Sequence, residues 1–336
     1  MKLFINQKIF LLFKQFLTIG TVLVILVAII GHIVRDRHIV LALMMYIPLL
    51  PLGLWAILLD LWQEGHSLPK LRFSLTIIGL IITIWGSYSM IGTGNNLAKI
   101  TANTISLLHW NVKWGGIGYN GHLTSQYTGD EWPSIRTDIF QHYPDIIVLN
   151  EPPQIDSWLA QLTQQMGPNW SMFKYYRTKR NGLAIFSSGK LQFERLAKIR
   201  NGMAMLVKVT VREQPLRLLL VDGKRSVRKV RTPLLTDIIK AVIDSDQQGQ
   251  PVDMIIGDFN AVSHSIGFDS YTTAAGGYQL ASKNARVWRG TWPFFLALYD
   301  IDHIWIHKRF QIIQLKMLMN LNTDHRGQLV YFQNNR

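Results

Sequence analysis

Residues 255–260 read Ile-Ile-Gly-Asp-Phe-Asn and close a run that begins at Val252 and is apolar except for Asp253. A short run that is apolar on both faces is typical of a buried strand in an α/β protein. Polar residues that directly follow such a strand are presented to solvent by a rigid sheet. Asp258 and Asn260 are therefore candidate functional residues, although Gly-Asp-Phe-Asn by itself more often forms a turn.

Four more segments place polar residues beside an apolar run in the same way. They are Leu-His-Trp-Asn at 108–111, Asp-Ile-Ile-Val-Leu-Asn-Glu at 145–151, Tyr-Asp-Ile-Asp-His-Ile at 299–304 and Thr-Asp-His-Arg at 323–326. Their carboxylate and amide oxygens suit a hard cation such as Mg²⁺ better than zinc. Each segment alone is a weak signal, and their number and order strengthen it.

Short apolar runs alternate with longer amphipathic stretches after residue 104, which predicts a mixed α/β sandwich with sheets inside and helices outside. The expected strands cover residues 105–109, 145–149, 183–187, 203–211, 216–221, 252–256, 301–306 and 328–332. The expected helices cover residues 132–142, 154–166 and 233–243.

The ordered set Trp-Asn-Val, strand-Asn-Glu, Gly-Asp-Phe-Asn, Asp-His-Ile and Asp-His-Arg resembles the motifs of the endonuclease/exonuclease/phosphatase superfamily. That superfamily includes DNase I-like nucleases, inositol polyphosphate phosphatases and neutral sphingomyelinases. The resemblance covers roughly residues 105–334. It implies a DNase I-like four-layer α/β sandwich over residues 105–336, with two packed mixed sheets flanked by helices. It also implies a metal-dependent hydrolase of phosphoric ester bonds.

The resemblance further implies a metal site for Mg²⁺, with Mn²⁺ as a possible substitute. Glu151 is expected to be the principal ligand, and Asn111 to hold the same ion. Asp324 is expected to lie beside the metal.

The same resemblance gives four residues catalytic roles. Asp258 is expected to orient or deprotonate the attacking water, and Asn260 to hydrogen-bond the phosphoryl oxygens. Asp302 is expected to pair with His325, which would donate to the phosphate or assist the nucleophile. Phosphoryl transfer needs in-line placement of water and neutralisation of charge on the non-bridging oxygens, and this set could supply both.

The chain departs from the family pattern at the strand that ends in Val-Asp-Gly-Lys, residues 221–224. Asp222 stands where family members usually carry a His, and an ionised carboxylate would repel phosphate. Lys224 or Arg225 could replace the lost donor, or the chemistry could be weakened. A third interpretation is that Asp222 merely begins a loop. The following run, residues 224–231, is strongly basic and is either a solvated loop or a phosphate contact.

Other aromatic and histidine residues carry weaker expectations. Trp114, Tyr119, Tyr127 and Trp132 could stack on a base or enter a lipid interface, although most aromatics belong to the core. Trp288 and Trp292 are expected to be packing residues. The spacing of His264 and His303 gives no support for a zinc site.

The first 92 residues carry 7 Lys and Arg and 3 Asp and Glu, and they contain three long apolar stretches. Stretches of about 20 residues are long enough for a helix to cross the hydrocarbon core. They predict an N-terminal anchor of three transmembrane helices, near residues 15–34, 39–61 and 73–92. The bend-forming Pro48 and Pro51 fall inside the second stretch. Residues 93–104 are small and polar and are expected to form a linker.

The distribution of Lys and Arg between the loops favours a cytoplasmic N-terminus in the cell (inner) membrane. Three crossings would then place the catalytic domain on the extracytoplasmic side. The lipid bilayer is thus an expected partner, and no obligate protein partner is evident.

Residues 93–336 carry 28 Lys and Arg against 18 Asp and Glu, a net charge of +10, which favours anionic partners. The chain has no Cys, which excludes disulfides and Cys-ligated zinc. The leading hypothesis is a membrane-anchored Mg²⁺-dependent phosphoesterase whose substrate is a nucleic acid, a phospholipid headgroup or a small phosphate ester. The alternatives are a catalytically weakened phosphate- or headgroup-binding module, and an inert outer domain whose candidate residues do not converge.

Overall fold

The structure is a computed structural model in which the chain forms two compact units. One comprises Met1–Ile91 with Val227–Val230, and the other comprises Gly92–Ser226 with Arg231–Arg336. The residues that the structure describes are 2–68, 71–94, 99–116, 131–178, 181–226, 229–293 and 295–335.

The first unit is helical, with α1 (Lys2–Val34), α2 (Ile39–Met45), α3 (Leu49–Trp62) and α4 (Ser74–Met90). By length and composition, the 26-residue stretch Ile9–Val34 could cross a membrane. The second expected span is broken, because α2 and α3 meet at an angle of 60°. Pro48 explains the break, since a proline disfavours helical backbone in the residue before it. The third, α4, is apolar but has only 17 residues.

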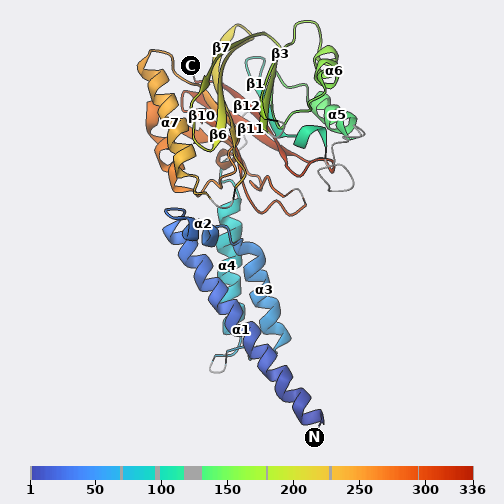
Figure 1. The fold of residues 1–336 in the computed structure, drawn as a ribbon, viewed down its shortest axis with the longest axis vertical. Helices are drawn as coiled ribbons and strands as arrows, with labels where there is room; N and C mark the ends of the chain where they lie inside the picture. The colour runs from blue at the N-terminus through green and yellow to red at the C-terminus, as the bar shows by residue number, and fades with distance from the viewer. Residues whose placement is uncertain are drawn as a thin grey trace. The chain divides into compact units, whose positions relative to one another are not determined.

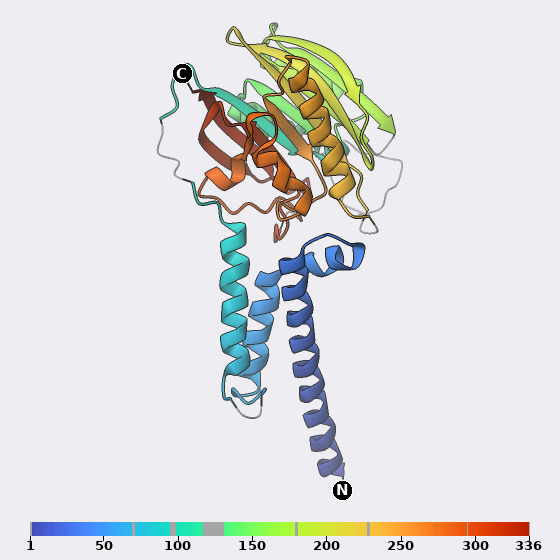
Figure 2. The same ribbon diagram turned by 90° about the vertical axis from the view of Figure 1, so that its left-hand side faces the viewer.

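Helices α3 and α4 run side by side (Figure 2). Gly53 permits this close approach, because a Cβ at that position would lie 2.6 Å from the Gly79 carbonyl oxygen. At the end of α3, the fully buried Asp60 accepts hydrogen bonds from the backbone nitrogen of Thr76 at 2.8 Å and its hydroxyl at 2.7 Å. Asp60 therefore ties the end of α3 to the start of α4.

The second unit contains two mixed six-stranded sheets (Figure 1). The first sheet has the order β11-β12-β1-β2-β4-β3 and the second has the order β5-β6-β7-β8-β10-β9. The strands of the first sheet are β1 (Ile105–Asn111), β2 (Ile146–Asn150), β3 (Ser171–Thr178), β4 (Asn181–Ser187), β11 (Phe310–Leu318) and β12 (Gly327–Asn334). Those of the second are β5 (Lys190–Ala197), β6 (Gly202–Val211), β7 (Gln214–Gly223), β8 (Met254–Asp258), β9 (Tyr278–Leu280) and β10 (Asp302–His307).

Three apolar clusters separate four layers. The central cluster lies between the two sheets and includes Leu107, Val148, Leu220 and Ile256. The helices α5 (Trp132–His142) and α6 (Asp156–Met166) pack on the outer face of the first sheet. The helix α7 (Thr232–Gln247) packs on the outer face of the second sheet. The expected four-layer sandwich is confirmed.

Four strands that the sequence does not predict, β3, β5, β9 and β11, are the four outer strands of the two sheets. An outer strand has one neighbour and is less covered, so it lacks the continuous apolar run of an inner strand. In β5, for example, no residue is fully buried. The pattern of apolar runs in the sequence therefore identifies the inner strands of each sheet and misses the outer strands.

The strand directions bring several chain segments to one end of the sandwich. β1 and β2 are parallel and end at Asn111 and Asn150, which are paired in register. In the second sheet, β7 and β8 are parallel and β10 is antiparallel to β8. The last residues of β7 and β8 therefore meet the first residue of β10.

Candidate functional site

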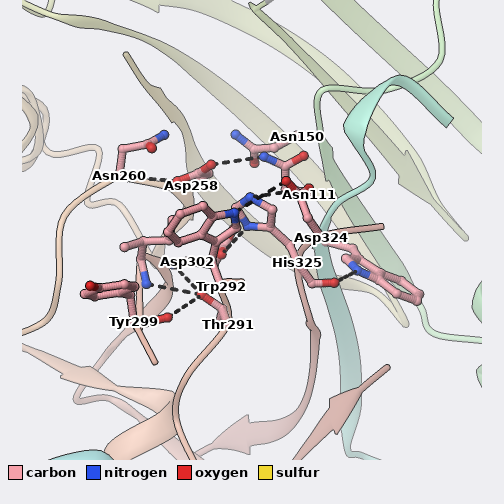
Figure 3. A network of polar contacts seen from close by, with 12 residues as sticks. Asn111, Asn150, Asp258, Asn260, Thr291, Trp292, Tyr299, Asp302, Asp324 and His325 are labelled. Carbon is pink, nitrogen blue, oxygen red and sulfur yellow. Dashed lines mark hydrogen bonds and ion pairs between the residues drawn. The ribbon is translucent and has the colours of Figure 1, made fainter. Parts of the chain in front are cut away.

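Three aspartates lie in register across the second sheet. Asp222 of β7 is paired with Asp258 of β8, which is paired with Asp302 of β10. All three are almost fully buried. The two sheets meet at this row, because the Asn111 Nδ2 of β1 donates to Asp258 Oδ2 at 3.0 Å (Figure 3). The polar residues at the strand ends thus converge from both sheets.

Asp302 and His325 form a buried pair at this junction (Figure 3). His325 Nδ1 lies 2.8 Å from Asp302 Oδ2, and Thr291 Oγ1 lies 3.2 Å from the Asp302 backbone nitrogen. Burial alone would lower the pKa of His325, but the Asp302 carboxylate raises it to about 10. Burial would raise the pKa of Asp302, and the opposing effect of His325 brings it below its ordinary value. The pair is therefore an imidazolium facing a carboxylate at neutral pH.

Both carboxylate oxygens of Asp258 are hydrogen-bonded. One accepts from the Asn260 backbone nitrogen at 2.8 Å, and the other accepts from Asn111. Burial and the neighbouring Asp302 carboxylate raise the pKa of Asp258 to about 7. The amide of Asn260 donates to the Gly223 carbonyl oxygen at 2.9 Å, which fixes its side chain at the end of β7. A carboxyl group of this kind can accept a proton near neutral pH.

Glu151 directly follows β2 and adopts a left-handed backbone conformation with φ of 47°. Its backbone nitrogen donates to the Gly182 carbonyl oxygen at 3.0 Å, which holds the turn against β4. Burial, with further repulsion from the Asp258 and Asp324 carboxylates, raises the pKa of Glu151 to about 8. Glu151, the expected principal metal ligand, thus lies close to two other carboxylates, those of Asp258 and Asp324.

Two side chains, those of Lys113 and Trp292, contact the Asp324 carboxylate. Lys113 Nζ lies 3.0 Å from Asp324 Oδ2, and Trp292 Nε1 donates to the same oxygen at 3.4 Å. Burial would raise the pKa of Asp324, but His325 and Lys113 hold it below its ordinary value. Trp292 packs against the Tyr299 ring, in line with the expected packing role, and it also contacts the candidate site (Figure 3). A strand-flanking tryptophan carries no sequence signal that would reveal such a hydrogen bond.

Asp222 is buried rather than the start of a solvated loop. Asn181 Nδ2 donates to Asp222 Oδ2 at 3.3 Å. Burial, together with the Asp258 and Glu151 carboxylates, raises the pKa of Asp222 well above its ordinary value. Lys224 and Arg225 are exposed, and Arg225 is near enough to Glu151 to oppose the rise of its pKa. Residues 227 and 228 of the basic run lie outside the described residues.

The structure gives a supporting role to two motif residues to which the sequence interpretation assigned none. His109 Nε2 and Asn150 Oδ1 lie 2.9 Å apart, and Asn150 Nδ2 donates to the Val221 carbonyl oxygen at 2.9 Å. This chain of contacts joins β1, β2 and β7. A polar residue inside an apolar strand could have revealed these contacts in the sequence, because buried polar groups need hydrogen-bond partners.

The other aromatic and histidine residues considered in the sequence have different environments in the structure. Trp132 is buried in the core, and Trp114 is half-buried, while Tyr119 and Tyr127 lie outside the described residues. His303 is a structural histidine whose Nε2 contacts the Ala261 carbonyl oxygen at 2.7 Å. Among the described residues, one group of potential metal-ligating side chains has its atoms within 4.8 Å of one another, and it consists of Asp258, Asp302 and His325.

A comparison with protein families matches residues 108–325 to the Endonuclease/Exonuclease/phosphatase family. No curated protein gives a significant match to the chain. Several solved structures share the fold.

One is an endonuclease/exonuclease/phosphatase family protein from Bacteroides thetaiotaomicron, with a TM-score of 0.54 and 14% identity over 70% of this chain and 100% of that one. The human Nocturnin catalytic domain with bound sulfate gives 0.53 and 15% over 70% of this chain and 96% of that one. D. rerio TDP2 complexed with a single strand DNA product gives 0.50 and 14% over 69% of this chain and 99% of that one.

Proposed function

Because the chain belongs to the endonuclease/exonuclease/phosphatase family, we propose that it is a membrane-anchored, Mg²⁺-dependent phosphoesterase that cleaves a P–O bond with water. The observation that carries the proposal is the convergence of Asp258, Asp302 and His325 from two sheets, beside Glu151. An inert outer domain would not require these groups to meet.

The proposed metal ligands are Asn111, Glu151 and Asp324. Their amide and carboxylate oxygens fit a hard divalent cation. The raised pKa of Glu151 supports this assignment, since crowded buried carboxylates are a place where a cation relieves repulsion. When bound, Mg²⁺ would neutralise charge on the phosphoryl oxygens. Mn²⁺ has similar ligand preferences and is a candidate substitute.

The proposed reaction uses the protein side chains as follows. Asp258 accepts a proton from the attacking water, which its pKa of about 7 permits near neutral pH. His325, held by Asp302 through Nδ1, directs Nε2 and its positive charge toward the phosphoryl group. Asn260 hydrogen-bonds a non-bridging oxygen.

Asp222 need not abolish activity. Burial and the neighbouring Asp258 and Glu151 carboxylates raise the pKa of Asp222 well above its ordinary value, which disfavours the ionised form that would repel phosphate. Arg225 supplies a nearby positive charge. These features favour an active enzyme over the weakened binding module.

The anchor is proposed to consist of α1, the bent pair α2–α3 and α4, with the N-terminus in the cytoplasm and the catalytic unit outside. The apolar composition of these helices and the distribution of Lys and Arg support this arrangement. Because the chain lacks Cys, a single Lys190→Cys substitution on exposed β5 allows a direct test. An impermeant maleimide should label it on intact cells, and labelling only after lysis would reverse the orientation.

The activity is tested with the full-length protein in detergent, using bis-p-nitrophenyl phosphate, p-nitrophenyl phosphate and plasmid DNA with Mg²⁺ or EDTA. Wild-type hydrolysis that requires Mg²⁺ and disappears in both Glu151→Ala and His325→Ala is the expected result. Folded protein without metal-dependent hydrolysis of any of these three esters, or of a phospholipid in liposomes, would reject the enzyme in favour of the binding module.

A further inference from the structure

Four apolar side chains beside the site are strongly exposed. They are Phe295 at 85%, Leu296 at 60%, Met319 at 61% and Leu321 at 80% of their accessible surface. We call these four residues the apolar rim. Single exposed apolar residues are common, but several on two segments that adjoin one site favour a binding surface.

The first half of the rim belongs to a short hairpin that begins at the site. The Trp292 backbone nitrogen donates to the Tyr299 carbonyl oxygen at 3.0 Å, and the reverse bond is 2.8 Å. The Trp292 side chain contacts Asp324, so the base of the hairpin lies on a proposed metal ligand (Figure 3). Phe295 and Leu296 follow Trp292 by only three and four residues.

The second half belongs to the loop that leads into Asp324. The side chain of Asn320 is turned inward and donates to Ser134 Oγ at 3.1 Å and to Asp138 Oδ2 at 2.6 Å. Thr323 is buried and donates to the Asn111 carbonyl oxygen at 2.9 Å. Met319 and Leu321 are therefore exposed on a loop that is tied down on both sides of Leu321. The Arg326 backbone nitrogen donates to the Thr291 carbonyl oxygen at 2.8 Å, which joins the residue before the hairpin to the segment that follows the second loop.

We propose that the apolar rim inserts into a lipid bilayer and that the substrate is a phospholipid whose phosphodiester enters the adjacent site. This inference rests on the proposed phosphoesterase function and specifies its substrate class. Insertion would take the rim out of water while Asp324 and His325 stay at the level of the headgroup phosphates.

Two further observations favour a bilayer over a soluble ester or nucleic acid. Helix α4 ends at Met90 and β1 begins at Ile105, so a connection this short, spanning at most about 50 Å, tethers the catalytic unit to the apolar helices. Lys224 and Arg225 are exposed beside the site, and Arg225 acts on Glu151. Cations that follow β7, close to Glu151, and exposed apolar side chains on the loops that hold Asp324 together match an anionic headgroup above acyl chains.

The first test measures insertion without using activity. The full-length chain carries no Cys, so Leu321→Cys and the control Leu196→Cys can each be labelled with bimane. Leu196 is 41% exposed on the outer strand β5. In phosphatidylglycerol/phosphatidylcholine proteoliposomes, lipids with nitroxide on the acyl chain should quench the label at position 321 and not at position 196. Equal quenching at both positions, or none at 321, overturns the insertion.

The second test compares substrates in the same proteoliposomes. Wild-type protein should hydrolyse phosphatidylglycerol, and Phe295→Ser/Leu321→Ser should lower the ratio of the lipid rate to the bis-p-nitrophenyl phosphate rate about tenfold or more. Leu196→Ser should leave this ratio unchanged. Wild-type protein that cleaves bis-p-nitrophenyl phosphate or plasmid DNA but no phospholipid overturns the inference while the proposed function stands. Quenching at 321 without hydrolysis of any ester rejects the proposed function and leaves the insertion in place.

Discussion

Asp302 and His325 meet 2.8 Å apart although their strands belong to different sheets, since Asp302 begins β10 and His325 precedes β12. The side chains are almost completely buried. The charge of the histidine therefore depends on the packing of one sheet against the other. A carboxylate in this position selects the Nδ1–H form of the ring and stabilises its positive charge.

Asp302→Asn should lower kcat for bis-p-nitrophenyl phosphate by about 10²–10⁴-fold, because the amide cannot stabilise the imidazolium that faces the phosphate. Steady-state kinetics of the full-length protein with Mg²⁺ measure this effect. His264→Gln is the matched control, since His264 is an exposed histidine, and it should keep wild-type activity. A folded Asp302→Asn protein with wild-type kcat would exclude a role for the pair in catalysis.

Glu151→Gln should raise the Mg²⁺ concentration for half-maximal activity by roughly a hundredfold or more, because a charged ligand becomes neutral. Titration calorimetry with Mg²⁺ gives a second measurement that does not depend on turnover. Glu213→Gln removes an exposed carboxylate in the turn between β6 and β7 and should leave the affinity unchanged. Unaltered Mg²⁺ binding in Glu151→Gln would contradict its assignment as the principal ligand.

The metal-free protein should lose stability as the pH rises from about 5 to 8.5. The folded pKa values of Glu151 and Asp258, about 8 and about 7, are above their unfolded values of 4.5 and 3.8. Such groups stabilise the fold fully below the unfolded pKa, and this contribution is lost as the pH passes the folded pKa. In EDTA, we expect Tm to fall on the order of 5 °C or more across this range.

Mg²⁺ should offset most of this loss, since it binds the ionised carboxylates of the folded state. Intrinsic tryptophan fluorescence during heating measures Tm with Mg²⁺ and with EDTA. Glu151→Gln/Asp258→Asn should flatten the dependence on pH in EDTA. A wild-type Tm that rises between pH 5 and 8.5 without metal would show that these carboxyl groups are ionised and already compensated.

Asp222→Asn should be tolerated better than loss of a catalytic group, because burial and the neighbouring carboxylates raise the pKa of Asp222 and disfavour its charged form. The amide keeps an oxygen that can accept from Asn181. We expect kcat within about fivefold of wild type and a smaller decrease of Tm between pH 5 and 8.5. A loss of activity as large as that of His325→Ala would mean that Asp222 acts as a carboxylate.

The sequence by itself determined the inner strands, the helices α5, α6 and α7 of the described part of the second unit and the order of the polar strand ends. Buried strands need continuous apolar runs, so Asp258 and Asn111 stand out directly at their ends. The outer strands β5 and β11 escaped detection because they are only partly covered and lack a continuous apolar run, and β9 because it has only three residues. β3 is likewise an outer strand. Similarly, composition indicated apolar helices, but the bend between α2 and α3 and the shorter α4 appeared only in the structure.

The tertiary structure decided which polar groups touch. Asn111 and Asp258 are separated by 147 residues and lie 3.0 Å apart, a distance that only the packing of the two sheets determines. The same holds for Trp292 with Asp324 and for the burial of Asp222, because local sequence does not encode a partner on another strand. The pKa values of about 8 for Glu151 and about 10 for His325 follow from this assembly, since burial and neighbouring charge exist only in the folded chain.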